Sequence, residues 1–181
     1  MNSTSGFYKI NNAGDRWYRD FEKIYSVSFP VYELRSDKQQ EYAFRDSRYN
    51  LFCILDEKKD MLCAFISFWE FERYIYIEHL AVNQELRGKN LGSKMLKDFN
   101  SETSKTIILE IDPIKDEIAE RRLRFYQKLG YVLNPYKHYH PAYNTEYPPH
   151  ELLVLNTGEQ LPPDLYETFK NDLENIIMKK V

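Results

Sequence analysis

The sequence predicts an α/β (α+β) domain in which helices flank a mixed β-sheet. Three observations lead to this class. The chain has 181 residues, enough for one domain with its own core. Strand-like and helical segments are interspersed along it. Residues 73–113 have the pattern strand, helix, strand, and such a crossover places two parallel strands in one sheet.

Two helices are expected first. The segment 14–29 gathers apolar residues on one helical face, namely Trp17, Phe21, Ile24 and Tyr25. Pro30 ends this helix. The segment 36–46 opens with Ser36 and has Gln39 three residues later, which is the pattern of a capping box.

Strands and helices then alternate along the chain. The expected strands are 49–57, 61–71, 73–82, 105–113, 131–134 and 150–155, and the further helices are 90–99, 116–130 and 162–180. The charged tip 58–60 predicts a hairpin between the first two strands. The last helix has an apolar stripe, and two uses stay open: packing on its own domain or forming a dimer seam.

Composition excludes several classes of function. A net charge of −3 and the lack of a basic stripe disfavour a nucleic-acid partner. No apolar run approaches the length of a membrane span, and no leader is recognised, so a cytoplasmic protein without a membrane partner is expected. Cys53 and Cys63 alone make neither a disulfide framework nor a zinc site. The histidines of 138–150 lack acidic or thiol partners at ligand spacing, so we expect no metal site.

The stretch "ELRGKNLGSKML" (85–96) joins the strand 73–82 to a helix. The first turn of a helix has unpaired N–H groups and attracts anions. Gly88 and Gly92 let a phosphate approach the backbone, and Arg87 and Lys89 add positive charge. The residues alone leave two interpretations open, a phosphate cradle or a surface turn with solvated cations. The spacing matches neither a Walker P-loop nor a Rossmann fingerprint.

A resemblance to a known family rests on two motifs. "AVNQELRGKNLGSKML" resembles the coenzyme-A-binding motif of the GNAT acetyltransferase family, Arg/Gln-x-x-Gly-x-Gly/Ala after a strand that ends in Ala-Val. Arg87 takes the first position, Asn90 replaces the first glycine, and Gly92 is the second. "RRLRFYQKLGYV" resembles the family's later helix, which ends in Phe-Tyr-x-x-x-Gly-Tyr/Phe.

The resemblance implies the GNAT fold, a mixed central sheet of about six to seven strands flanked by helices. It covers residues 6–156, and residues 157–181 would be a C-terminal helical extension on the same domain. Acetyl-CoA is the implied cosubstrate, with no metal. Its implied contacts are Leu80, Ala81 and Val82 on the strand and Arg87, Gly88, Lys89, Asn90, Leu91, Gly92 and Ser93 on the turn. If the turn needs a positive φ at Asn90, asparagine is the least costly substitute for glycine.

The implied reaction is direct attack of an amine on the thioester, so no nucleophilic side chain is needed. In the family a tyrosine that corresponds to Tyr126 protonates the leaving thiolate, and its ordinary pKa of about 10 suits that role. Glu78 resembles the strand glutamate that serves as base. His79, which strand alternation puts on the opposite face from Glu78, and Glu110 are the other candidates, as is water.

The acceptor is less well defined by the sequence. In this fold the loop between the first two helices and the tyrosine- and histidine-rich segment 136–150, near the last two strands, shape the acceptor pocket. Glu33 would hold a cationic amine and Arg35 a carboxylate, and Glu110 is a third candidate. The other interpretation of Glu33 and Arg35 is that each is a surface charge. A small primary amine is the favoured acceptor. A protein or peptide amine, or a catalytically inactive acyl-CoA-binding sensor or scaffold, are the alternatives. A monomer and a homodimer are both compatible with the sequence.

Overall fold

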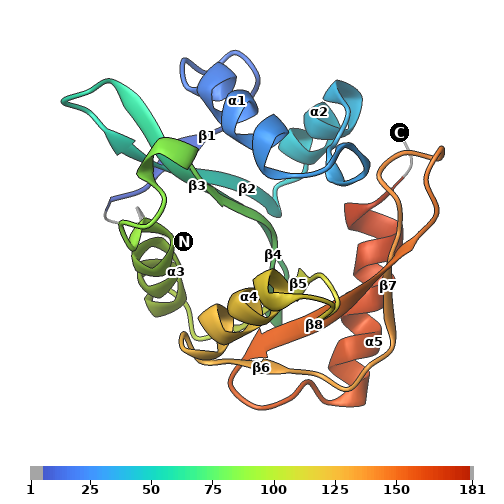
Figure 1. The fold of residues 1–181 in the computed structure, drawn as a ribbon. Coiled ribbons are helices and arrows are strands. Elements are labelled where there is room, and N and C mark those ends of the chain that lie inside the picture. Colours follow the sequence, from blue (N-terminus) through green and yellow to red (C-terminus); the bar gives the residue numbers. More distant parts are fainter. Residues whose placement is uncertain (1–5, 180–181) are drawn as a thin grey trace.

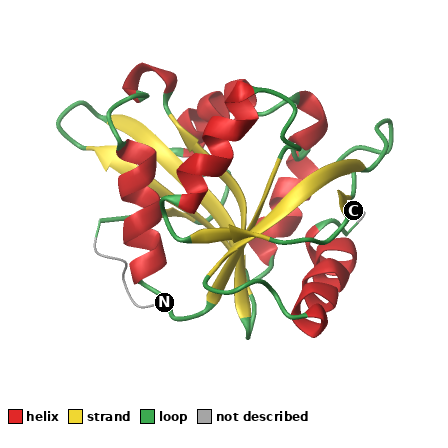
Figure 2. Ribbon diagram, turned by 60° about the horizontal axis from the view of Figure 1, so that its bottom comes forward, coloured by secondary structure: helices red, strands yellow, loops and turns green. Residues whose placement is uncertain are grey.

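A computed structural model describes residues 6–179 of the chain. An eight-stranded sheet forms its centre, and helices cover both faces (Figures 1 and 2). The strands are β1 (Tyr8–Ile10), β2 (Tyr49–Asp56), β3 (Met61–Glu70), β4 (Tyr74–Val82), β5 (Thr106–Ile111), β6 (Tyr131–Leu133), β7 (His138–His140) and β8 (His150–Thr157). The helices are α1 (Tyr18–Ser28), α2 (Asp37–Arg45), α3 (Leu91–Ser101), α4 (Glu117–Gln127) and α5 (Pro163–Asp172), with short turns η1 (Val31–Glu33), η2 (Gln84–Leu86) and the π-helical η3 (Leu173–Ile177).

The sheet has the strand order β1-β2-β3-β4-β5-β8-β6, and β7 pairs with the first half of β8. Strands β4 and β5 are parallel. Their pairing begins with Tyr74 opposite Thr106 and ends with Ile77 opposite Leu109. The other pairings are antiparallel. The predicted mixed α/β class is therefore confirmed, and so is the crossover through α3 that makes β4 and β5 parallel.

Local sequence signals explain where several elements begin. The Ser36 side chain accepts from the Gln39 N–H while the Gln39 side chain accepts from the Ser36 N–H, which confirms the capping box. The Asp116 carboxylate accepts from the Ala119 N–H at the start of α4. The predicted hairpin is formed by β2 and β3.

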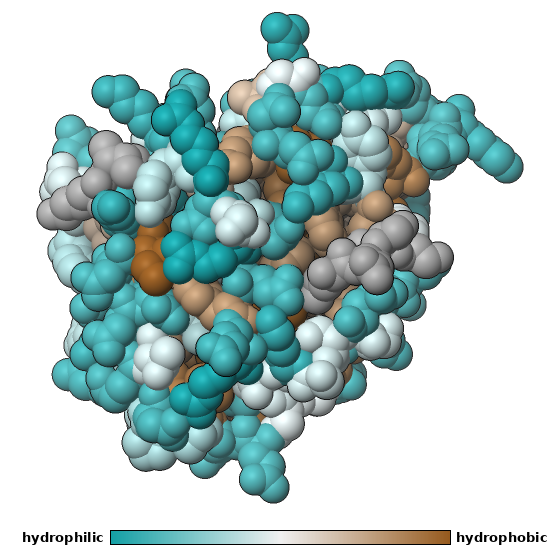
Figure 3. All heavy atoms as spheres, turned by 180° about the vertical axis from the view of Figure 1, so that it is seen from behind, coloured by the Kyte–Doolittle hydropathy of each residue, from teal (hydrophilic) through white to brown (hydrophobic). Residues whose placement is uncertain are grey.

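Two apolar layers pack on the two faces of the sheet. Apolar side chains of α1 and α5 pack on one face, with a smaller contribution from α2, and those of α3 and α4 pack on the other. The apolar stripe of the C-terminal helix lies within the first layer and is buried, through Leu165, Phe169, Leu173 and Ile177. Hydrophilic residues dominate the surface seen in Figure 3, where hydrophobic ones show mainly in the gaps between them.

The sheet has two strands more than the six runs found in the sequence. β1 and β7 have three residues each, too few for an alternating pattern to be recognised. Their pairing is decided by a neighbouring long strand, since β1 adds to the edge of β2 and β7 to that of β8. Among the described helices, none is long and apolar enough to cross a membrane.

Candidate functional site

A bulge in β4 creates the site. Ser67 of β3 lies opposite His79, but the next residue, Phe68, lies opposite Ile77, so Glu78 is an extra residue in β4. The pairing of β4 with β5 also ends at Ile77. Beyond it the two strands separate, and a cavity of about 550 Å³ lies between them.

The bulge corrects one expectation from the sequence. Strict alternation predicts that Glu78 and His79 point to opposite faces. Tyr143 instead contacts both, donating from its hydroxyl to Glu78 and lying with its ring 5.8 Å from the His79 ring. Beyond the bulge Ala81 packs in the α1 and α5 layer, whereas Leu80 and Val82 pack in the α3 and α4 layer. The extra residue therefore turns Glu78 and His79 to the same side.

The turn before α3 has the backbone that an anion cradle needs. Gly88 has φ +78°, and Asn90 has φ 58° and ψ 14°, which confirms the left-handed conformation expected there. The helix begins at Leu91, and its first N–H groups have no acceptor within the helix. A Cβ atom at Gly92 would lie 3.4 Å from the Val82 side chain, which is van der Waals contact, so this helix end packs directly against β4.

The cations of the turn have different positions. Arg87 lines the cavity and donates to the Val82 carbonyl and to the Ser28 hydroxyl, each at 3.4 Å. Lys89 is exposed beside the turn. Leu80, Ala81 and Val82 line the cavity along β4, and Gly92 lines it from α3. The structure thus brings the three predicted strand residues together with Arg87 and Gly92 of the turn, whereas residues 88–91 and Ser93 do not line the cavity.

Tyr126 reaches the same cavity from α4. Its ring packs edge-on against Phe125 and Tyr131, with centroids 5.1 and 5.6 Å apart. Burial raises the pKa of Tyr126 above its ordinary value, against the opposing effect of Arg122, so the phenol stays protonated at neutral pH. No hydrogen bond is formed by its hydroxyl within residues 6–179.

Glu78 lies in a closed network of hydrogen bonds. Its side chain is fully buried and pairs with Arg35, whose Nη2 lies 2.6 Å from Glu78 Oε1. Trp69 Nε1 donates to the other oxygen at 3.0 Å, and the Tyr143 hydroxyl donates at 2.8 Å. Burial alone would raise the pKa of Glu78, but the Arg35 guanidinium holds it below the ordinary value. Arg35 is itself buried and does not line the cavity, so it is not available to hold an acceptor carboxylate.

Glu110 lines the cavity but is also engaged. It pairs with His138, and the Tyr76 hydroxyl donates to it, while His140 Nε2 lies 3.8 Å away. Burial opposes ionisation, yet the neighbouring His140 and His138 lower the pKa of Glu110 to about 2. A carboxylate with so low a pKa is a weak proton acceptor at neutral pH. His79 is also a weak proton acceptor at neutral pH, because burial lowers its pKa to about 4 and the ring is neutral there.

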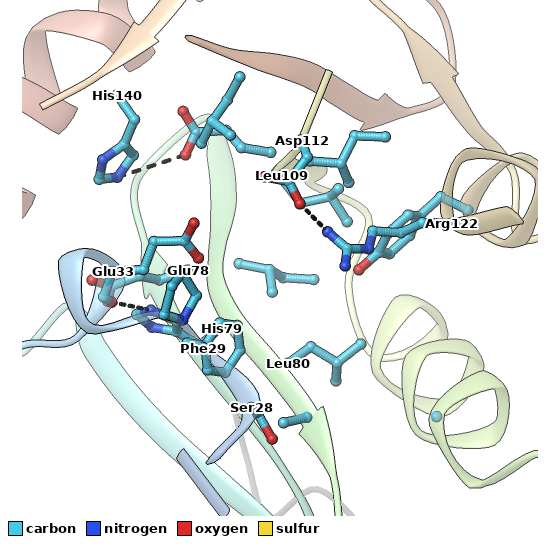
Figure 4. A pocket seen from close by; sticks show the side chains of 18 of the residues that line it. Ser28, Phe29, Glu33, Glu78, His79, Leu80, Leu109, Asp112, Arg122 and His140 are labelled. Atoms are coloured by element: carbon cyan, nitrogen blue, oxygen red, sulfur yellow. Dashed lines mark hydrogen bonds and ion pairs between the residues drawn. The ribbon is translucent and has the colours of Figure 1, made fainter. Parts of the chain in front are cut away.

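Glu33 differs from the other cavity carboxylates. Its side chain extends from η1 into the cavity (Figure 4). His150 Nε2 lies 3.9 Å from Glu33 Oε1, beyond hydrogen-bond distance. Burial raises the pKa of Glu33 to about 7, and the negative charge of Asp112 acts in the same direction.

Several cavity residues were not identified from the sequence. Tyr143 and the ion pair between Asp112 and Arg122 are the clearest cases. The sequence predicts that segment 136–150 forms part of the pocket, but the roles of its individual residues depend on the pairing of β7 with β8. Among the described residues, no group of three or more potential ligands is arranged to hold a metal ion.

The comparisons with known proteins agree with this geometry. A family model described as "Acetyltransferase (GNAT) domain" matches residues 47–133. The Bacillus subtilis (strain 168) protein named "Putative acetyltransferase YjbC" is 33% identical over 114 residues, which cover 62% of this chain and 54% of that protein. The match thus spans about half the length of this curated relative.

Solved structures extend the likeness over the whole chain. A GNAT-family protein of Bacteroides thetaiotaomicron is 26% identical, with a TM-score of 0.86, and the match covers 97% of this chain and 99% of that one. A Bacillus subtilis acetyltransferase solved with CoA shares the fold at 15% identity, with a TM-score of 0.59 over 84% of this chain and 97% of that one. These relatives are described as acetyltransferases, and the split between β4 and β5 with the left-handed turn beside it agrees with that class. Residues 47–133 match the GNAT acetyltransferase domain, and the described chain has the GNAT fold.

Proposed function

We propose that the protein transfers the acetyl group of acetyl-CoA to a primary amine, most naturally that of a small molecule. The observation that carries this proposal is the left-handed turn at Gly88 and Asn90, which opens the N-terminus of α3 at the mouth of the cavity between β4 and β5. An open helix end with an adjacent arginine suits a diphosphate.

The chain's residues fit this cosubstrate. The turn 87–93 would hold the phosphates, because the chain turns at Gly88 and Asn90 and leaves the first N–H groups of α3 without acceptors in the helix. Residues 80–82 of β4 lie beyond the last residue paired with β5, so no described strand pairs with them on that side. Apart from the Val82 carbonyl, which accepts from Arg87, their main chain could pair there with an amide-containing arm. When bound, the cosubstrate supplies an activated acetyl thioester.

The reaction requires protons to move at two atoms. The amine nitrogen forms a bond to the thioester carbon, the carbon–sulfur bond breaks, sulfur gains one proton, and the ammonium nitrogen loses two. We assign the donation to sulfur to Tyr126. Its side chain lines the cavity, it is protonated at neutral pH, and its hydroxyl is not committed to a protein acceptor among the described residues.

For Glu78 we propose a positioning role in place of the proton-accepting one that its strand position predicts. A carboxylate that already accepts from Arg35, Trp69 and Tyr143 has little capacity to take a further proton. Its contacts instead hold the bulge and the segment around Tyr143 in register. The cavity shape depends on both.

Mass spectrometry of acetylated products tests the function. Purified protein, acetyl-CoA and a pool of small amines and basic peptides are incubated together, and acetyl-CoA binding is measured by calorimetry. We expect a product with the wild type. Tyr126→Phe should lower turnover by about 10²-fold or more, the usual contribution of a positioned acid, with acetyl-CoA affinity almost unchanged.

Tyr139→Phe is the matched control, because Tyr139 is 47% exposed and lies outside the cavity. It should behave as wild type. A product formed equally fast by Tyr126→Phe would refute the acid role. Bound acetyl-CoA without any product from the pool would favour an acyl-CoA sensor over the enzyme.

A further inference from the structure

One carboxylate of the cavity lining accepts no hydrogen bond from the described residues. Glu78 is paired with Arg35, Glu110 with His138, and Asp112 with Arg122. Glu33 is the remaining acidic residue of the cavity lining, and among the described residues no donor lies within hydrogen-bond distance of its carboxylate. Only 22% of its side chain is exposed, so this charge is neither solvated like a surface carboxylate nor neutralised by the protein.

The backbone holds Glu33 in place. Its carbonyl oxygen lies 3.1 Å from His79 Nε2 and accepts from the Tyr25 hydroxyl at 3.3 Å. Both partners are buried, so the residue is anchored while its carboxylate extends into the cavity (Figure 4). The position therefore combines a fixed main chain with a free acidic group.

The groups around Glu33 do not supply a compensating cation. Burial lowers the pKa of His150, and the nearby His140 acts in the same direction, so His150 is neutral at pH 7. His79 is neutral for the same reason of burial. Arg122 is the cation that faces Glu33, but it is paired with Asp112. The titratable groups that face this carboxylate are His79 on β4, Glu110 and Asp112 at the end of β5, Arg122 on α4, His140 on β7, His150 on β8 and Tyr32 beside it.

We propose that Glu33 binds the ammonium of the acceptor and takes its first proton. This proposal rests on the acetyltransferase function proposed above and deepens it. The ammonium nitrogen gives one proton to the Glu33 carboxylate, which becomes a carboxylic acid and later releases that proton to solvent. The neutral amine then attacks. The second nitrogen proton leaves after the carbon–nitrogen bond has formed and restores, through solvent, the proton that Tyr126 gave to sulfur.

The lining around Glu33 also restricts the acceptor. The Tyr32 ring, 37% exposed, lies 5.6 Å from the His150 ring and 5.9 Å from the Tyr147 ring, and Phe29 lines the cavity beside it. A polyamine would bring further ammonium groups, whereas the other cavity carboxylates are already paired. The acceptor class that fits is a primary amine with one positive charge and a flat apolar substituent.

The protonation behaviour of Glu33 supports the same role. Burial and Asp112 raise the pKa of this carboxyl to about 7, which is close to the value at which a general base is most effective in neutral solution. Above that pH it is ionised and ready to accept a proton, and below it the site is already protonated.

The test uses 2-phenylethylamine as the probe acceptor and spermidine as the polycationic comparison. Steady-state kcat/KM is measured from pH 5.5 to 9.5 for the wild type and Glu33→Gln. For the wild type, log kcat/KM with 2-phenylethylamine should rise with a slope of one and level off near pH 7. For Glu33→Gln, kcat/KM should be about 10²-fold lower at pH 7.5. Its logarithm should keep rising as pH approaches the pKa of a free amine, about 10. Glu151→Gln, at an exposed residue of β8 outside the cavity, should match the wild type.

The outcomes separate this proposal from the function itself. An unchanged pH profile in an active Glu33→Gln overturns the proton-accepting role and leaves the acetyltransferase intact. Spermidine acetylated with a higher kcat/KM than 2-phenylethylamine overturns the acceptor class.

A second readout does not depend on turnover. Carbon-13 NMR of glutamate-labelled protein should show one carboxyl that titrates near pH 7 and disappears in Glu33→Gln. Saturating 2-phenylethylamine should lower that midpoint by at least one pH unit, because a bound ammonium favours the carboxylate. A midpoint that the amine does not move overturns the proposal even if no amine in the pool is acetylated.

Discussion

Replacing Arg35 by methionine should expose how strongly the bulge depends on its buried ion pair. The change keeps most of the apolar stem but removes the cation that lies 2.6 Å from Glu78. It also removes the hydrogen bond from Arg35 Nη2 to the Ile177 carbonyl. Glu78 would keep Trp69 and Tyr143 as donors but would be a buried charge without a counter-ion.

The size of the effect follows from burial. The two side chains are 3% and 0% exposed, and removing one partner of such a pair costs about 3–5 kcal/mol of unfolding free energy. The loss should depend on pH. Without Arg35, burial raises the folded-state pKa of Glu78 above its unfolded value, so stability falls as pH rises between those two values. The deficit should therefore be larger at pH 8 than at pH 5.

Urea unfolding at both pH values measures this effect. The double variant Arg35→Met/Glu78→Gln is the matched comparison, because it removes both charges. It should recover part of the loss at pH 8. A single variant that loses less than about 1 kcal/mol, or a double variant no more stable than Arg35→Met at pH 8, would show that the pair is not a stabilising unit.

Further predictions concern the cradle and the dependence on pH. Arg87→Ala should weaken acetyl-CoA binding about tenfold in calorimetry, equivalent to about 1.4 kcal/mol, with Lys97→Ala as an unchanged control; equal affinity would exclude a phosphate contact for Arg87. Asn90→Gly should keep or improve that affinity, since glycine adopts φ 58° without strain, and a marked loss would reveal a direct contact of the asparagine side chain. Glu33→Gln should raise the unfolding free energy by about 1–3 kcal/mol at pH 8 but little at pH 4.5, because a carboxyl whose folded pKa is raised from 4.5 to about 7 loses stability as pH rises through that window. The pKa of His79 is about 4 in the folded state against 6.5 in the unfolded chain, so stability should fall as pH drops through that window. In His79→Gln the melting temperature should depend less on pH between those values.

Much of the fold was accessible from the sequence because its signals are local. The capping box at Ser36, the hairpin tip at 58–60 and the left-handed position at Asn90 each depend on a few neighbouring residues. The turn before α3 was accessible for the same reason, since a helix start and its flanking glycines are contiguous in the chain. Such features carry their own physical cause and need no knowledge of the tertiary fold.

The interior of the site was much less accessible. A bulge is a mismatch between two strands, so the extra residue at Glu78 has no signature in β4 alone. The partners of Glu78 come from three places: the loop between η1 and α2, strand β3, and the segment before β8. The partners of Glu110 come from β4 and β7. Which carboxylate is paired, and which is free, is decided by these distant contacts. For this reason the sequence presents Glu33 and Arg35 alike, as charged candidates for binding the acceptor. In the structure Arg35 is buried and paired with Glu78, whereas the Glu33 carboxylate extends into the cavity.

The bond from Arg35 to the Ile177 carbonyl has a practical consequence for handling the protein. The last described helical turn is connected through one guanidinium to the strand that forms the cavity floor. The Tyr74 hydroxyl makes a second such link, donating to Asp172 at 2.7 Å. Shortening the chain before η3, or attaching a bulky affinity tag close behind it, would therefore disturb the cavity from about a hundred residues away in sequence. A loss of activity on C-terminal trimming would report on this connection and would not require a chemical role for the removed residues.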